Sequence, residues 1–111
     1  MTAHSTAQNW AADVKKYAAN VDEAAVEGIV HYCGIALQQK DSSLVAFSDK
    51  KEVERVRDHF LKHKLGLTNS DPELDKAIME VGEKMKTGHG KNRVTAYYLL
   101  ADRFGKLPAL H

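Results

Sequence analysis

Cysteine, proline and long apolar runs are scarce in this chain of 111 residues, and each scarcity excludes a class of protein. The single cysteine, Cys33, cannot form an intrachain disulfide, which excludes the disulfide scaffolds of small secreted proteins. No apolar run approaches the ~20 residues of a membrane span, and residues 1–9 lack the apolar stretch of a signal peptide. We therefore expect a reduced cytoplasmic protein that does not enter a membrane.

An excess of charge of either sign is also missing. Lys and Arg number 16 against 15 Asp and Glu, which gives a net charge of +1. The hydrophobic share of 43% and the charged share of 28% are typical of a soluble globular domain. This length supports one domain over residues 1–111, with a flexible N-terminus over residues 1–6 and a C-terminal tail over residues 106–111.

The spacing of the apolar residues is helical along the whole chain. It predicts five main helices and one short connecting turn near Asp41. Two stripes lie in the first third, two more follow from Val53 and from Leu74, and the broadest lies over residues 92–104. A helix that is apolar on most sides is usually central, so we place the helix over residues 92–104 in the middle of the bundle. The predicted class is all-α, a compact single-domain bundle.

Several residues have the chemistry of helix ends. Asp22 fits the N-cap of the second helix, and Asp49 with Glu52 fits a capping box at the start of the third. Gly66 and Gly105 are placed to end helices, and Pro72 fits the first turn of the fourth. Gly28 and Gly34 lie inside the expected second helix, where they indicate a close approach of another segment or a bend.

The connector over residues 39–48 is expected to fold its apolar residues, Leu44, Val45 and Phe47, onto the core. No segment of the chain shows the strict alternation of a half-buried strand.

Three stretches resemble one known family. They are Val21–Val26 with the following Gly34–Leu37, then Asp41–Leu67, and then Ala96–Ala101 followed by Phe104–Leu107. Together they resemble a small bacterial family known as domain of unknown function 2853, over about Trp10 to Leu107. His59 departs from the Asn that relatives carry before the Phe. The resemblance implies a compact helical bundle of bacterial origin and implies no activity, so no catalytic or binding residue is carried over.

Two pairs of residues have side chains that can form reactive or metal-binding sites. His59 and His63 are four apart on one helix, the geometry of half a metal site, but zinc needs three or four ligands and the sequence supplies no others nearby. Cys33 lies on an apolar stripe, and His31 two residues away points elsewhere. We expect a solvated face for the histidines and a packed thiol for Cys33, with no metal and no cofactor.

The glycine-rich corner before the last helix offers the one candidate ligand site. Gly88 and Gly90 free the backbone there, Lys91 and Arg93 add positive charge, and a helix N-terminus presents unpaired N–H groups. This arrangement predicts weak binding of an anion such as phosphate. The alternative is that the two glycines make a turn, with the basic groups paired to Glu80 or Glu83.

The third helix carries many basic residues, but acidic residues lie between them. The connection that follows this helix is too long for a helix-turn-helix. Nucleic acid is therefore not an expected partner. No catalytic motif is present, so we expect a noncatalytic helical interaction module that binds a protein partner or a second copy of itself. Anion binding at the corner over residues 88–93 is the alternative, and an enzyme with a site assembled from distant residues is a third reading.

Overall fold

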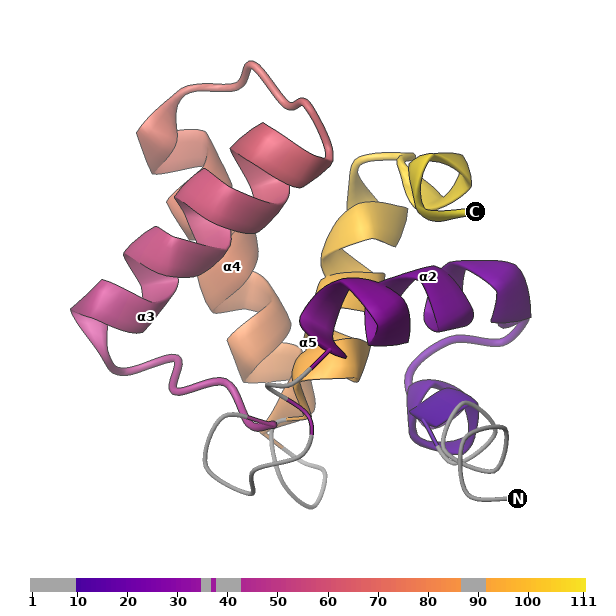
Figure 1. Ribbon diagram of the computed structural model, residues 1–111. Helices are drawn as coiled ribbons and strands as arrows, with labels where there is room; N and C mark the ends of the chain where they lie inside the picture. The colour runs from indigo at the N-terminus through magenta and orange to yellow at the C-terminus, as the bar shows by residue number, and fades with distance from the viewer. Residues whose placement is uncertain (1–9, 35–36, 38–42, 87–91) are drawn as a thin grey trace.

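The described part of the chain is mainly helical, as its computed structural model shows (Figure 1). The structure describes residues 10–34, 37, 43–86 and 92–111. After a helical stretch over residues 10–14, the elements are α2 (Glu23–Cys33), α3 (Lys50–Arg55), the π-helix η2 (Val56–Lys64), α4 (Asp71–Met85), α5 (Arg93–Arg103) and the 3₁₀ turn η3 (Leu107–Leu110). Within these ranges no strand forms, and the β-type pairing is one isolated bridge between Leu44 and Asn92. The predicted all-α class is confirmed.

Helix α5 lies at the centre of the fold, as its broad apolar pattern predicts. Every residue from 93 to 101 is buried, because α2, α4, η2 and η3 all contact this helix. In Figure 1, α5 lies behind α2, with α4 beside it. Gly105 ends the helix with a φ of 67°, and the Lys106 N–H then closes onto the Ala101 carbonyl at 2.8 Å. That positive φ is the conformation that favours glycine.

Helix α2 begins where the sequence predicts and ends earlier. The Asp22 carboxylate caps it by accepting the Ala25 N–H at 3.1 Å. The expectation that Gly34 lies inside the helix is wrong, since Gly34 has a φ of 52° and ends it. Gly28 does lie inside, and there the expected close approach is confirmed. A Cβ on Gly28 would be 1.7 Å from the Leu110 carbonyl oxygen, so no larger residue fits without movement.

Among the described residues, the first predicted stripe is helical only in its first part. The helical stretch stops at Val14, and residues 15–17 form a turn. The N–H groups of Tyr17 and Ala18 both donate to the Val14 carbonyl, at 2.9 and 3.1 Å. Val21 consequently lies in the link to α2, although it still packs against the core.

The third predicted helix forms without a break but changes its winding. Helix α3 continues into η2, where the Leu65 N–H donates to the carbonyl of Phe60, five residues back, at 2.9 Å. The wider π turn suits a buried set spaced by four and five residues, namely Val56, Phe60, Leu61 and Leu65. Gly66, with a φ of 71°, ends the helix as predicted.

The connector before α3 is only partly as expected. Val45 and Phe47 are buried as predicted, but Leu44 is 40% exposed. Leu44 turns outward because its backbone faces α5, where its carbonyl accepts a hydrogen bond from Arg93 at 3.1 Å. The expected turn near Asp41 lies outside the described residues.

The segment predicted as a C-terminal tail contains a 3₁₀ turn. Residues 107–110 form η3, Leu110 is 3% exposed, and η3 contacts both α2 and α5. Its apolar Leu110 gains more from burial than from solvent, which explains why the segment folds back. The predicted flexible segment over residues 1–6 lies outside the described residues.

Candidate functional site

A hollow lies between α4 and α5, and the sequence of α4 explains one of its walls. At the helix start Ser70 and Glu73 form the capping pair, with the Glu73 carboxylate accepting the Ser70 hydroxyl at 3.0 Å, and Pro72 occupies the first turn. The predicted apolar stripe from Leu74 to Met85 faces the core. Glu80 and Lys84 fall outside that stripe and are left on the rim of the groove.

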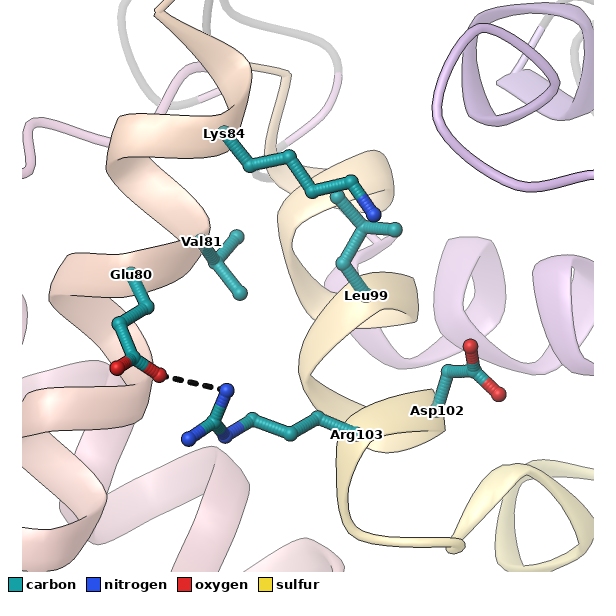
Figure 2. A pocket seen from close by; sticks show the side chains of 6 residues that line it. All are labelled: Glu80, Val81, Lys84, Leu99, Asp102 and Arg103. Carbon is teal, nitrogen blue, oxygen red and sulfur yellow. Dashed lines mark ion pairs between the residues drawn. The ribbon is translucent and has the colours of Figure 1, made fainter.

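The second wall is the last turn of α5. We call the hollow the α4–α5 groove, with a volume of about 310 Å³ and six lining residues, Glu80, Val81, Lys84, Leu99, Asp102 and Arg103. Val81 and Leu99 are buried side chains that make an apolar floor. Figure 2 shows Arg103 reaching from α5 to Glu80 on α4, and the two form an ion pair at 2.6 Å.

The groove is neutral and carries both signs of charge. Two carboxylates, an ammonium and a guanidinium surround the apolar floor, and the lining includes no His, Cys or Ser that could serve as a nucleophile or general base. The Glu80–Arg103 pair is nearly half exposed on both sides, so it is weak and can be exchanged for other partners. The groove therefore offers ion pairs and apolar contacts to another surface.

No pattern in the sequence marked these six residues as a group. The only local signal is the pair Glu80 and Lys84, four apart on the exposed face of α4. Their meeting with Asp102 and Arg103 depends on how α4 packs against α5, which is a tertiary fact.

Arg93, a predicted anion ligand, is committed to the interior instead. It is 7% exposed and forms an ion pair with Glu52, which is 6% exposed. Its guanidinium also donates to the Tyr97 hydroxyl at 3.0 Å. Burial alone would lower the pKa of Arg93, but interactions with Tyr97 and Glu52 raise it above its ordinary value. Arg93 therefore stays charged and links α5 to α3.

The capping box expected from Asp49 and Glu52 is half right. Asp49 caps α3 by accepting the Lys51 N–H at 3.0 Å. Glu52 does not reach back to the cap, because it turns inward to Arg93, and its second oxygen accepts from Arg55 at 3.2 Å. Glu52 is therefore a buried carboxylate, which its helix position alone does not indicate.

The N–H groups at the start of α5 are not unpaired, contrary to the premise of the anion site. The Arg93 N–H donates to the Ser43 carbonyl at 2.8 Å, and the Asn92 side chain accepts from Val94 at 2.9 Å and from Thr95 at 3.4 Å. Arg93 does not pair with Glu80 or Glu83 either. Gly88, Gly90 and Lys91 lie outside the described residues, so anion binding by them stays a prediction.

The two histidines are exposed and the cysteine packs against the core, as the sequence suggests. His59 and His63 are exposed on η2, and no group of three or more His, Cys, Asp or Glu side chains able to hold a metal occurs among the described residues. Cys33 packs against the core, and burial raises the pKa of its thiol to about 12, with the Arg93 charge opposing slightly. A thiol this hard to ionise is a poor nucleophile.

Basic residues on the third predicted helix, now α3 and η2, form ion pairs with acidic residues. Arg57 pairs with Asp58 at 2.9 Å and with Asp75 on α4 at 3.1 Å, and Lys62 contacts Asp71. The hydrogen bond from Arg57 lowers the pKa of Asp58. These pairs fasten η2 to α4 and neutralise much of the positive charge on that face.

The fold defines a small all-α bundle with a central helix, a neutral surface groove and a buried polar centre. The chain matches the family described as Protein of unknown function (DUF2853) over residues 9–108, and it belongs to that family. The predicted resemblance is thereby confirmed. No curated protein matches the chain. No helix in the described residues is long and apolar enough to cross a bilayer.

Proposed function

We propose that this chain is a noncatalytic interaction module that self-associates through the α4–α5 groove. The observation that carries the proposal is the charge pattern of the groove, in which Glu80 and Asp102 balance Lys84 and Arg103. In a twofold dimer the same patch meets itself, so a patch must carry both signs to be attracted to its own copy. A groove of one sign would repel its copy.

The groove also has features that allow such a contact to form. Val81 and Leu99 offer apolar surface at its floor, and the Glu80–Arg103 pair is exposed enough to exchange partners. Figure 2 shows Lys84 extended over Leu99, and Asp102 on the outer side of α5. A second copy can place its basic groups against Asp102 and its acidic groups against Lys84.

We propose that the protein acts in the cytoplasm of a bacterium. The bacterial origin is supported by the family resemblance. The cytoplasmic location is supported by a lone cysteine that packs against the core and has no partner within the chain for a disulfide.

Sedimentation equilibrium of paired charge variants tests the proposal. We expect the average mass of the natural chain to rise toward a dimer between about 10 μM and 1 mM protein, a range that detects association free energies of about −4 to −7 kcal/mol. Lys84→Glu makes the groove acidic and Asp102→Lys makes it basic. Each variant alone should be monomeric, and an equimolar mixture should regain the dimer.

The matched control is Lys51→Glu, an equal charge change at an exposed position on α3. It should dimerise like the natural chain. A natural chain that stays monomeric over the whole range, or variants whose mixture stays monomeric, would overturn the proposal. Far-UV circular dichroism of each variant confirms that the fold is retained.

A further inference from the structure

The C-terminal turn η3 rests on α2 at a position built to receive it. Gly28 presents bare backbone on α2, and the Leu110 carbonyl approaches so closely that a Cβ would overlap it. Leu110 itself is buried. The packing of η3 therefore depends on one glycine that leaves room and one apolar side chain that fills it.

A second contact holds the same turn at the start of α2. The His111 Nε2 lies 2.6 Å from the Asp22 Oδ2. The other oxygen of Asp22 caps α2, and the Asp22 backbone N–H donates to the Tyr98 hydroxyl of α5 at 2.8 Å. Asp22 thus lies where α2, α5 and the C-terminal turn meet.

Among the described residues, charged and titratable groups adjoin this contact from α2, from α5 and from the link before η3. Glu23 follows Asp22 in the first turn of α2 and is exposed, Tyr98 is the titratable group that α5 places against Asp22, and Lys106 precedes η3. The charges at the end of α5, Asp102 and Arg103, line the α4–α5 groove. The pKa of Asp22 is lowered chiefly by the hydrogen bond from His111, with burial opposing.

We infer that His111 and Asp22 form a proton-controlled latch that fastens η3 to α2. An imidazole changes charge between about pH 5 and 8. When it is protonated it donates a charge-assisted hydrogen bond to the carboxylate, which is roughly twice as strong as a neutral one. When it loses its proton the weaker bond remains and the turn opens more often, exposing the Gly28 face of α2.

Asp22 sets the lower end of the pH range in which the latch holds. Its folded pKa lies below its ordinary value, so the carboxylate contributes stability above the ordinary value and loses it as the pH falls through the lowered one. The latch is therefore firmest in mildly acidic solution and loosens in both directions.

Amide hydrogen exchange followed by NMR between about pH 5 and 8 tests the latch. The reporters are the Ala109 and His111 N–H groups, which donate to the Lys106 and Pro108 carbonyls inside the turn. After correction for intrinsic rates, we expect their protection to fall about threefold across this pH range, because charge-assisted bonds are the stronger ones. The amide of Leu100, inside α5, should not change with it.

Three variants separate the latch from general loosening. His111→Gln keeps a neutral side-chain donor and should hold the low protection at every pH. Asp22→Asn keeps an N-cap for α2 but removes the charge, and should also abolish the pH dependence. His31→Gln, at an exposed position on α2, should behave like the natural chain. Protection that is flat with pH in the natural chain, or a pH dependence that survives in His111→Gln, overturns the inference.

Discussion

Arg93 and Glu52 form a buried ion pair that joins the first turn of α5 to α3 across 41 positions of sequence. Arg93 also donates to the Leu44 carbonyl and to the Tyr97 hydroxyl, so one guanidinium holds three segments together. Two charges taken out of water are tolerable only when each satisfies the other. The pair thus acts as a structural tie in the polar centre of the bundle.

Removing one member of this tie should be costly. We expect Glu52→Ala to lower the free energy of unfolding by about 3 kcal/mol, because it leaves Arg93 buried without its carboxylate. Urea denaturation followed by circular dichroism measures the change. Glu83→Ala, which removes an exposed carboxylate from α4, should cost well under about 1 kcal/mol.

Replacing both charges is the sharper test of the same tie. The double variant Glu52→Leu/Arg93→Met should recover most of the stability lost in Glu52→Ala, since apolar pairs of similar volume often substitute for buried ion pairs. If the double variant is less stable than the single one, the loss comes from packing and not from an unpaired charge.

Variants of Tyr98 test whether α5 is buried. Its side chain is 1% exposed, and its hydroxyl accepts from Asp22 and donates to the Asn20 carbonyl at 3.4 Å. Tyr98→Phe should cost about 1 kcal/mol for the lost hydrogen bonds. Tyr98→Asp should cost about 4 kcal/mol or more, because it buries an unpaired charge. Thermal and urea unfolding measure both, and equal costs would contradict the burial of the ring.

Replacing Gly82 on α4 by alanine should destabilise the fold, and a second substitution should relieve the effect. An added Cβ would lie 2.8 Å from the Phe47 ring, so Gly82→Ala should destabilise by about 1–3 kcal/mol. On a Phe47→Leu background the clash is relieved, and the same change should become neutral or stabilising by up to ~1 kcal/mol through helix propensity. A destabilisation that is equal on both backgrounds would show that the ring is not the cause.

Cys33 should react slowly in the folded chain. Because burial raises the pKa of its thiol to about 12, little thiolate exists near neutral pH. We expect alkylation by iodoacetamide at about pH 8 to be at least about a hundredfold slower than in urea, where a thiol ionises near 8.5. Mass spectrometry of timed samples gives both rates. Similar rates in the two conditions would mean that the thiol is open to solvent.

Much of the local structure could be predicted because it depends on neighbours in sequence. The caps at Asp22, Asp49 and Gly105 and the stripe of α4 follow from side chains within a turn of one another. The central place of α5 follows from its breadth of apolar residues. The all-α class and the family membership rest on the same information.

The end of α2 at Gly34 and the π winding of η2 could not be predicted in this way. Gly34 is compatible with a helix interior or with a helix end, and packing chooses between them. The apolar spacing of residues 56–65 fits an α-helix nearly as well as a π-helix, so it does not choose between them, and η2 packs against α4 and α5 in the folded chain.

By itself, the sequence determined the helices, most of their ends, the fold class and the family. The tertiary structure decided which charges are buried and which face each other. Glu52 and Arg93 are ordinary helix residues by position, and only the tertiary fold, which brings the two side chains together, takes them out of water. The α4–α5 groove and the contact of His111 with Asp22 arise in the same way, because both join side chains that sequence spacing leaves far apart.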